Sequence, residues 1–449
     1  MPTVSTLVPE IFAHRLEKAV EAVLDCEDRI QVFSHHDADG LSAAAVISSA
    51  LERASKSFQV RILKGLSKSF IDSLARDKTY IFMDMGSSYT SELEEFHKVI
   101  ILDHHKPTRD SDVLFHINSH ILGVDGTSEA SASTLAFLFA LGMEYGNWDL
   151  ASLAMVGMIG DKQHIGGFRG VNHNIVKAAV EKGVVDTRWG LVVHEDTLLA
   201  SISTSFDPFF CGLSGDVDAT RKFLEKNNFE PDAAISSLEE GEMRRLASIL
   251  ALGMIKRGLD PVVIESISDT VYFQPDSGVG LRTLVEYADA AGKNKIGGTG
   301  VAMIRGSTWA RDMVGEYFSS YRKSILELLT LLYRDGAENM GSIQCIDSDD
   351  VRFNGALAGI GMQFILPQNM PVFSISKLDG KARVSCRGTR KLVAEGLDLS
   401  SVCRISAEKV GGEGGGHPVA SGATLPYDKK KEFLDNANKM VSTQLSKKD

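Results

Sequence analysis

The sequence has no apolar run approaching the roughly 20 residues that a membrane-spanning helix needs. Its first residues, Met-Pro-Thr-Val-Ser-Thr, lack the charged and apolar regions of a signal peptide. The five cysteines are odd in number and scattered without paired spacing, which disfavours both a disulfide framework and a cysteine-based zinc site. These absences predict a globular protein in the cytoplasm.

Other features that the sequence lacks exclude further classes of protein. The chain has no apparent internal repeat or low-complexity segment, and no serine or cysteine is accompanied by a convincing catalytic triad. With 48 basic and 59 acidic residues, the net charge of −11 argues against indiscriminate binding to long duplexes. One basic stretch alternates with apolar residues as a strand does, and it predicts a directed basic surface: Lys377, Lys381, Arg383, Arg387, Arg390 and Lys391.

The first part of the chain alternates between β-prone and helical segments. Such alternation predicts an α/β fold with a doubly wound, mostly parallel sheet. The expected strands lie near Ile30–Ser34, Phe58–Leu63, Thr79–Met83 and Lys98–Leu102, and the expected helices at Glu10–Leu24, Leu41–Arg53, Ala130–Leu141, Asp149–Met158 and Asn172–Lys182.

At 449 residues the chain can form two or three domains. We expect a catalytic domain over 1–185, a largely helical connector or insertion over 186–335, and a smaller α/β domain over 336–449. In the middle region the expected elements are helices within 231–254 and 311–334, a strand at 261–267 and a loop at 292–300. In the last region they are strands near 342–346, 371–376 and 382–386, helices at 398–409 and 430–445, and a glycine-rich loop at 411–418.

Two clusters of carboxylates and imidazoles follow β-prone runs. His35-His36-Asp37-Ala38-Asp39-Gly40 comes after the first run, and Asp103-His104-His105 comes after the fourth. The loops at the carboxyl ends of adjacent parallel strands are where α/β proteins bind ligands. In an extended chain, residues 35, 37 and 39 would point to the same side. The two clusters therefore predict one metal centre.

A calcium-binding EF-hand is the nearest rival interpretation of the first cluster. That loop needs a bidentate glutamate six residues after its glycine, and Val46 occupies this position. The residues between are typical of the start of a helix, so calcium is not expected here.

Single residues between and after the clusters carry less information. Asp84 ends the apolar run before Met85-Gly86 and stands between the two clusters, which favours a ligand over a simple turn residue. Asp161, taken alone, is more typical of a surface residue or a helix cap. His104 and His105 are adjacent and cannot easily share one direction. Either one of them is a core histidine whose hydrogen bonds are satisfied, or one binds metal and the other contacts the substrate phosphate.

Taken in order, these motifs resemble the DHH phosphoesterase superfamily. The set comprises His-x-Asp-x-Asp-Gly, Asp-x-Gly, Asp-His-His, Gly-Asp and a late Gly-Gly-Gly-His, which is similar to the DHH-associated C-terminal domain. Residues 118–123 and 128–133 also resemble the family segment that follows Asp-His-His. The resemblance covers roughly 1–185 and 336–449, and the spelling of the first motif is most like the archaeal RecJ-like single-strand nucleases.

The resemblance implies a two-metal site that hydrolyses phosphodiesters with a metal-activated water. Two divalent ions are implied, with Mn²⁺ preferred and Mg²⁺ possible, since oxygen and imidazole ligands suit both. Asp103 would orient the site and His105 would face the scissile phosphate. The implied ligands are His35 and Asp37 for one ion, Asp39, His104 and Asp161 for the other, and Asp84 as a bridge.

The resemblance also implies how substrate is held. Arg387, Gly415, Gly416 and His417 would bind the end of a nucleotide chain, which favours an exonuclease acting on single-stranded DNA or RNA. Glycines without Cβ atoms allow the backbone to approach an anion closely. Implied protein partners are replication or repair proteins, such as a GINS-like complex or a helicase.

Two alternatives stay open at this point. The same chemistry serves enzymes for short oligonucleotides, cyclic dinucleotides or nucleoside bisphosphates. An inactive DHH relative serves in the eukaryotic replicative helicase, so a non-catalytic scaffold is the third hypothesis. Such a scaffold should lack metal ligands, whereas this sequence has every expected one.

Overall fold

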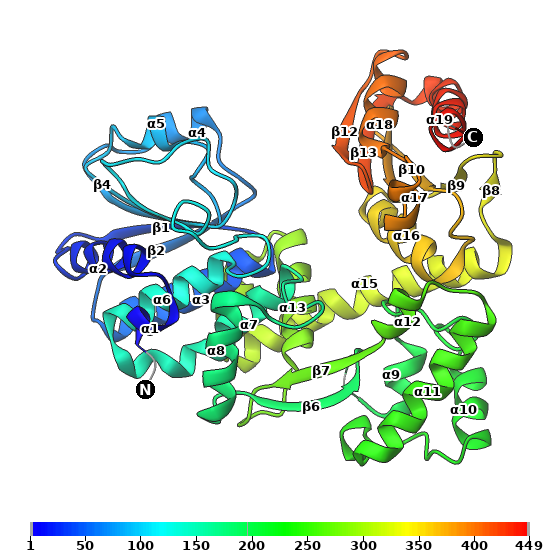
Figure 1. Cartoon of the computed structure of the whole chain (residues 1–449), viewed down its shortest axis with the longest axis horizontal. Helices are drawn as coiled ribbons and strands as arrows, with labels where there is room; N and C mark the ends of the chain where they lie inside the picture. The colour runs from blue at the N-terminus through cyan, green and yellow to red at the C-terminus, as the bar shows by residue number, and fades with distance from the viewer. Residues whose placement is uncertain (1–2, 195, 447–449) are drawn as a thin grey trace. The chain divides into compact units, whose positions relative to one another are not determined.

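The computed structural model describes residues 3–194 and 196–446 (Figure 1). They form two compact units. The first comprises the residues up to Arg188 together with Thr270–Ser320, and the second comprises Trp189–Asp269 together with the residues from Tyr321 onward. Residues of the predicted middle region, 186–335, occur in both units. The strand pair β6 (Asp186–Leu191) and β7 (Ser268–Phe273) and helix α15 (Thr308–Asp335) run across the boundary.

The first unit is built on a five-stranded sheet in which every strand is parallel to its neighbours. The order is β2-β1-β3-β4-β5, so the chain starts near one edge and moves outward in both directions. This confirms the predicted doubly wound α/β fold. The strands are β1 (Ile30–His35), β2 (Phe58–Leu63), β3 (Thr79–Met83), β4 (Lys98–Asp103) and β5 (Phe115–Asn118), of which only β5 was not predicted.

Helices cover both faces of this sheet. On one face, aromatic residues of the strands, including Phe33 and Phe82, pack with Ile71 of α4 (Lys68–Asp72) and Leu93 of α5 (Thr90–Leu93). Figure 1 shows α2 (Glu10–Leu24), α3 (Ala38–Arg53) and α6 (Ala132–Met143) on the opposite side. The unit is completed by α1 (Val4–Leu7), a 3₁₀ turn at Tyr145–Leu150, α7 (Ala151–Gly160), α8 (Gly170–Glu181), α13 (Leu281–Lys293) and α14 (Gly297–Ile304).

Helix α3 is the central helix of this unit. Every residue from Ala38 to Leu51 is buried, and the helix contacts α6, α7, α13 and α14 as well as the sheet. The side chains of Ala43, Ala44 and Ala45 are short, so neighbouring helices can approach α3 closely on several sides. Its first turn lies at the carboxyl end of β1, so the helix positions Asp37 and Asp39 of the cluster His35–Gly40.

The second unit combines a helical part with a mixed sheet. The helical part contains α9 (Leu198–Ser203), α10 (Val217–Lys226), a 3₁₀ turn at Ile235–Ser237, α11 (Glu240–Lys256) and α12 (Pro261–Glu265). The remaining elements are β8 (Glu338–Asn339), β9 (Gln344–Asp347), Val351–Phe353 (3₁₀), α16 (Asn354–Ile360), Gly361–Ile365 (π), β10 (Val372–Leu378), β11 (Lys381–Arg387), α17 (Arg390–Ala394), α18 (Leu399–Glu408), β12 (Glu413–His417), β13 (Ala420–Pro426), Tyr427–Lys429 (3₁₀) and α19 (Lys430–Leu445).

The six strands of this sheet have the order β12-β13-β11-β10-β9-β8. Strands β9 and β10 are parallel, and the other pairs are antiparallel. Strand β11 alternates as its sequence predicts: Ala382, Val384 and Cys386 are buried, while the basic residues lie on the other face. Helix α18 contacts β12 and β13, and Phe433 of α19 packs against Phe373 of β10.

Three expectations about local structure were wrong. Residues 261–267, expected as a strand, begin with helix α12, because Asp260 caps it by accepting a hydrogen bond from the Val262 N–H and Pro261 occupies its first position. The expected loop at 292–300 contains the end of α13 and the start of α14. The expected glycine-rich loop at 411–418 contains β12, an edge strand paired with β13.

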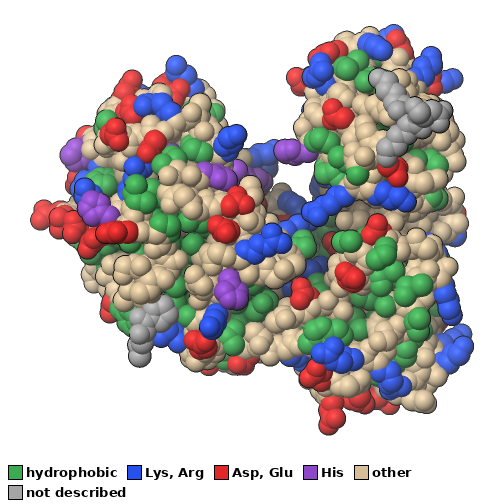
Figure 2. All heavy atoms as spheres, in the orientation of Figure 1, with side chains coloured by type: hydrophobic (Ala, Val, Ile, Leu, Met, Phe, Trp, Pro, Cys, Tyr) green, Lys and Arg blue, Asp and Glu red, His purple; other side chains and the backbone are tan. Residues whose placement is uncertain are grey.

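The surface carries charges of both signs. On the face shown in Figure 2, acidic and basic side chains are interspersed with apolar ones. None of the helices among the described residues has both the length and the apolar character needed to cross a bilayer.

Helix α13 packs closely against the backbone of the cluster His35–Gly40. A Cβ atom added to Gly292 would lie 1.7 Å from the carbonyl oxygen of His36, so the site tolerates no side chain there. We expect Gly292→Ala to lower the free energy of unfolding by about 1–3 kcal/mol, as overpacking does. The matched control is Gly298→Ala in α14, where an added Cβ meets nothing within 4 Å. Thermal melting checks this; equal melting temperatures for the two variants would contradict the contact.

Candidate metal centre

The candidate ligands come from four places at the carboxyl edge of the parallel sheet. His35 is the last residue of β1, Asp84 follows β3, His104 follows β4, and Asp161 is the C-cap of α7. Their spacing had suggested an extended chain through Asp37 and Asp39, but the strand ends before them. Asp37 is instead the N-cap of α3, and Asp39 lies in the first turn of that helix. The turn between strand and helix brings them to the same place by another route.

The structure gathers these side chains into two adjoining groups, and Asp84 and His104 also form a third group with His105. His35, Asp37 and Asp84 form one group, and Asp39, His104 and Asp161 form the other; within each, potential ligand atoms lie within 4.8 Å of one another. The Nδ1 atom of His35 is 2.9 Å from Asp37 Oδ2 and 3.3 Å from Asp84 Oδ2. His104 Nε2 is 3.3 Å from both Asp84 Oδ1 and Asp161 Oδ2. Asp84 therefore presents one oxygen to each group.

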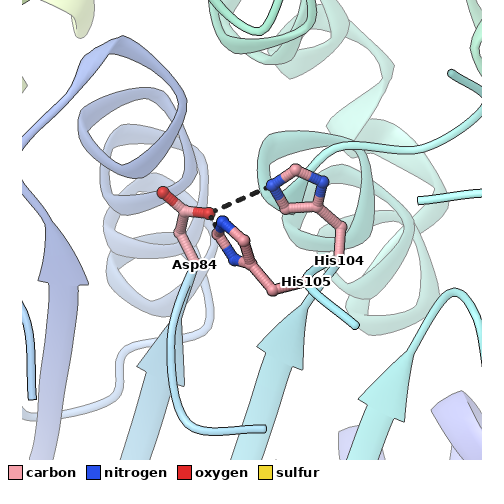
Figure 3. Close-up of side chains that lie close together, drawn as sticks. All are labelled: Asp84, His104 and His105. Atoms are coloured by element: carbon pink, nitrogen blue, oxygen red, sulfur yellow. Dashed lines mark ion pairs between the residues drawn. The ribbon is translucent and has the colours of Figure 1, made fainter. Parts of the chain in front are cut away.

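Asp84 has the features of a bridging ligand. It is buried, and its φ of +59° places it in the left-handed region, which Asp and Asn visit more readily than most residues. Its Oδ1 accepts no hydrogen bond of good geometry from a described residue, and the nearest donors are His104 Nε2 at 3.3 Å and His105 Nδ1 at 3.6 Å; a buried carboxylate oxygen in this position depends on nearby positive charge. Figure 3 shows this carboxylate pointing toward the imidazoles of His104 and His105. A set of oxygen and imidazole ligands around such a buried carboxylate fits a divalent ion.

Asp39 is held from the opposite side by the start of α6. Its Oδ2 accepts the backbone N–H of Ala132 at 2.7 Å, and its Oδ1 accepts the N–H of Ser133 at 3.0 Å and the Ser131 hydroxyl at 2.8 Å. Asp39 also lies in the first turn of α3, so two helix N-termini converge on one carboxylate. Helix N-termini stabilise negative charge. This arrangement fixes both oxygens while leaving the group able to contact a cation.

His104 is oriented by the carbonyl of Gly126. Its Nδ1 lies 2.7 Å from that oxygen, which directs Nε2 toward Asp84 and Asp161. The amide of Gln163 donates to the same carbonyl at 3.0 Å. A histidine whose second nitrogen donates to a backbone carbonyl is the usual arrangement of a metal ligand, because the hydrogen bond sets the tautomer and the ring orientation.

His35 has a similar support in His36. The Nδ1 atom of His36 lies 3.1 Å from Nε2 of His35, and the two rings meet edge to face at 4.5 Å. One ring nitrogen of His35 thus faces His36, while the other faces Asp37 and Asp84. The sequence interpretation gave His36 no role.

His105 is positioned by Asp103 and projects from the site. Asp103 Oδ1 accepts both the backbone N–H of His105 at 3.1 Å and the Nδ1 of its ring at 2.9 Å. The carboxylate is buried, whereas 59% of the His105 side chain is exposed. The backbone carbonyl of His105 accepts a hydrogen bond from the Asn118 amide at 2.8 Å. The ring therefore has a fixed inner nitrogen and an outer edge open to a ligand.

Hydrogen bonding to Asp103 raises the pKa of His105, so its imidazole gains a positive charge more readily than a free histidine. Burial alone raises the pKa of Asp103, but the hydrogen bonds from His105 and Ser87 outweigh it and hold that pKa below its usual range. Both shifts in pKa favour an ion pair between Asp103 and His105.

The two ligand histidines are strongly basic without metal. Burial lowers the pKa of His35, but Asp37 and Asp84 outweigh it and raise the pKa to about 10. Burial likewise opposes charge on His104, yet Asp84 and its other carboxylate neighbours raise the pKa to about 11. Both imidazolium groups offset the carboxylates in place of an ion.

Two of the carboxyl groups have a raised pKa because they are buried next to other negative charges. Burial and the charge of Asp39 raise the pKa of Asp161 to about 8. Burial and the charge of Asp84 raise the pKa of Asp39 to about 6. Negative charge is therefore crowded at this edge of the sheet, which is the condition that favours cation binding.

The C-terminal residues that the resemblance singled out lie on the second unit. Arg387 and His417 both align with Ala420 on the intervening strand β13, which places them on one face of the sheet, about 9–10 Å apart in strand spacing. Gly415 opens onto the same face, with nothing within 4 Å of an added Cβ.

Gly416 has a different reason to be glycine. Its φ is +141°, and an added Cβ would lie 2.7 Å from the carbonyl oxygen of Ala420. Gly414 is required by packing, because an added Cβ would meet the Cys403 carbonyl oxygen of α18 at 2.6 Å. Of the glycines assigned to substrate, only Gly415 has the open surroundings that a close backbone approach by a ligand requires.

Comparisons with known proteins match two parts of the chain. Residues 29–158 match the DHH family, N-terminal domain, and residues 354–443 match the DHHA1 domain. The first match contains all the candidate ligands except Asp161, which lies three residues beyond it; the second contains Arg387 and His417.

One relative extends along nearly the whole chain. It is an uncharacterized protein of Methanocaldococcus jannaschii, MJ0831, 30% identical over 445 residues that cover 96% of this chain and 98% of that protein. Two solved structures share the fold. CDC45 from Entamoeba histolytica has a TM-score of 0.65 at 12% identity, with 96% of this chain and 99% of that chain covered. RecJ from Thermus thermophilus in complex with Mn²⁺ has a TM-score of 0.58 at 17% identity, with 97% of this chain but only 55% of that chain covered.

The carboxyl edge of the parallel sheet gathers carboxylates and imidazoles of the kinds that bind divalent metal. The chain belongs to the DHH phosphoesterase superfamily, whose members are metal-dependent phosphoesterases, and its fold is RecJ-like.

Several supporting residues were not identified from the sequence. Ser131 had a usable signal, because a serine before an apolar helix is a typical N-cap. Gln163 and Asn172 had none: the Asn172 amide donates to Gln163 Oε1 at 2.6 Å, and both are buried amides in unremarkable sequence. Asn118 was noted as part of a family-like segment but received no role.

Metal binding should release protons. Metal ligation requires neutral imidazole and ionised carboxylate. The pKa values of His35, His104 and Asp161 are about 10, 11 and 8. At pH 7 these three side chains therefore carry protons that a bound ion must displace. We therefore expect the apparent affinity to rise with pH from about 6 to 8, and Mn²⁺ titration at pH 7 to release more than one proton per chain. Calorimetry in buffers of different ionisation enthalpy measures this number; proton uptake, or none exchanged, would contradict the crowded-charge account.

Proposed function

We propose that this protein is a two-metal phosphodiesterase that removes nucleotides from an end of single-stranded DNA or RNA. The observation that carries the proposal is the division of one buried carboxylate, Asp84, between two adjoining ligand groups. In this proposal His35 and Asp37 hold one ion, Asp39, His104 and Asp161 hold the other, and Asp84 contacts both. Mn²⁺ is the preferred ion and Mg²⁺ the alternative, since the ligand set contains oxygen and imidazole only.

When bound, such ions supply Lewis-acid chemistry, which activates water and offsets charge on the phosphate and the leaving oxygen. The chain's own residues supply orientation. Asp39 is fixed by the start of α6, and His104 by the Gly126 carbonyl, so the ligands are preorganised before substrate arrives. No movement of a main-chain segment is needed to assemble them.

His105 is the residue proposed to contact the reacting phosphate. Its Nδ1 is fixed on Asp103 and lies 3.6 Å from Asp84 Oδ1, while much of the side chain is exposed. A protonated imidazole in this place donates a hydrogen bond to a phosphate oxygen, and it can give a proton to the leaving oxygen. Asp103 acts as a positioning residue that keeps the ring oriented and charged.

The face of the C-terminal sheet supports the choice of a nucleotide chain as substrate. Arg387, Gly415 and His417 lie on one face of β11 and β12, with the half-buried Arg383 on the same side of β11. A guanidinium and an imidazole near an accessible backbone are suited to a phosphate-bearing end. In this proposal they hold the terminal nucleotide. Association with replication or repair proteins, a GINS-like complex or a helicase, belongs to the same proposal.

Asp84→Asn is the sharpest single test. Asparagine keeps the shape of the side chain and tolerates φ +59°, so the fold should survive, whereas the shared negative charge is lost. We expect Mn²⁺-dependent hydrolysis of a single strand to fall by more than about 100-fold, because losing even a supporting group of a metal site costs 10–100-fold. Asp72→Asn, at an exposed position of helix α4, is the matched control and should keep full activity.

The same assay separates the alternatives when its substrates vary in length. End-labelled DNA and RNA strands of roughly 2 to 20 nucleotides span the site sizes expected for single-strand binding. Turnover restricted to dinucleotides, cyclic dinucleotides or nucleoside bisphosphates would replace the exonuclease with the small-substrate alternative. Strand binding without turnover of any substrate would favour the non-catalytic scaffold. Unchanged turnover in Asp84→Asn would remove the proposed site.

A further inference from the structure

A short aromatic loop follows directly on the candidate ligand Asp161. We define the aromatic loop as residues 162–169, Lys-Gln-His-Ile-Gly-Gly-Phe-Arg, which connect α7 to α8. All of these residues belong to the first unit, as does the part of β7 from Thr270 onward. Apart from Gln163, which donates to the Gly126 carbonyl, these residues have no role in the site described above.

The loop is anchored to the metal centre at its start. Gln163 is buried; its backbone N–H donates to Met158 O at 3.1 Å, and its side-chain amide donates to Gly126 O, the carbonyl that also orients His104. Lys162 adopts φ +59°, so the chain turns sharply right after Asp161. The position of the loop is thereby coupled to that of the ligands.

Beyond the anchor the loop presents apolar and aromatic surface to solvent. Ile165 is 60% exposed, and Phe168 and His164 are half-buried. The Phe168 ring packs edge-on against Tyr272 of β7, with centroids 5.6 Å apart, and lies 6.3 Å from the His164 ring. Phe168 therefore lies between His164 and Tyr272 and remains partly exposed. Exposed apolar surface next to a polar site is typical of a ligand contact.

Two cations flank the aromatic residues. Lys162 begins the loop and Arg169 ends it; both are exposed, and neither forms an ion pair with another described residue. The Arg169 guanidinium lies close to the middle of the loop, since a Cβ added to Gly166 would be 3.7 Å from its Nη2. Cations beside aromatic rings suit single-stranded nucleic acids, because phosphates contact the charges and bases stack on the rings.

We propose that the aromatic loop binds a nucleotide beside the metals, with Phe168 stacking on its base and Lys162 and Arg169 contacting the adjacent phosphates. This inference rests on the proposed nuclease function and deepens it, since it assigns a base contact that the ligands and His105 do not provide. Stacking accepts any base, so the loop holds the strand without reading its sequence. It also predicts that a strand lacking that base is a poorer substrate.

The test compares two strands with Phe168→Leu and wild-type protein. One strand is normal, and the other carries abasic residues in place of its terminal nucleotides. Leucine keeps apolar volume at a half-buried position but cannot stack. We expect kcat/KM on the normal strand to fall about 10-fold, in the range that single base–aromatic contacts contribute. On the abasic strand the variant and the wild type should be equal, and Phe168→Tyr should restore wild-type activity on the normal strand.

Trp309→Leu is the matched control. Trp309 is an exposed aromatic residue of the same unit, 64% exposed on α15. Arg305, four residues earlier, donates to Ser49 and pairs with Glu52 at the carboxyl end of α3, the opposite end from Asp39. The control variant should match wild type on both strands.

A binding measurement keeps the two proposals distinguishable. Ca²⁺ in place of Mn²⁺ holds a strand with terminal 2-aminopurine uncut, and stacking on Phe168 quenches its fluorescence. Quenching by wild type that disappears in Phe168→Leu supports the base contact even if no strand is cut, which would count against the nuclease proposal alone. Normal strand cutting with equal quenching in both proteins, or equal slowing of Phe168→Leu on both strands, would overturn the base contact and leave the nuclease proposal standing.

Discussion

The structure depends on the mutual repulsion of buried carboxylates at the carboxyl edge of one parallel sheet. Asp39 and Asp84 are almost inaccessible to water, and Asp161 is largely buried beside them. Uncompensated charges in such surroundings are expensive, because burial removes their solvation. Without metal, compensation comes from His35 and His104, whose pKa values rise to about 10 and 11. The site is therefore arranged for positive charge of some kind, and a divalent ion would supply it in the most compact form.

The rest of the first unit can be understood as the scaffold that holds this unfavourable cluster together. Helix α3 brings Asp37 and Asp39 in at its N-terminus, and α6 contributes its own N-terminus to Asp39. Residues far along the chain complete the support, because α13 contacts the His36 carbonyl through Gly292. A region that looks like an insertion in the sequence thus contributes directly to the architecture of the site.

The sequence was sufficient to predict the sheet, because alternating β-prone and helical segments leave few other arrangements. It was also sufficient to name the six candidate ligands, since each follows a recognisable strand or belongs to an ordered family motif. Whether they bind metal stays a prediction, but the structure brings them together in the two expected groups. The supporting residues were beyond reach: Gln163 and Gly126 meet only because distant loops converge, and nothing in their local sequence signals it.

The errors in local structure have specific causes. Residues 261–267 contain a β-branched run too short for periodicity to separate strand from helix, and the Asp260-Pro261 start signal is the feature that distinguishes the two. The glycines of 411–416 suggested a loop, whereas Gly414 and Gly416 serve the close packing and backbone geometry of edge strand β12. Glycine content alone does not distinguish these uses.

The central claim is that one buried carboxylate serves two ions. Anomalous diffraction from crystals soaked in Mn²⁺ tests it most directly, because it locates each ion and its ligands independently of any activity. The account predicts two peaks about 3.5–4 Å apart, with Asp84 bound to both. A single peak, or two peaks that do not share Asp84, would contradict it.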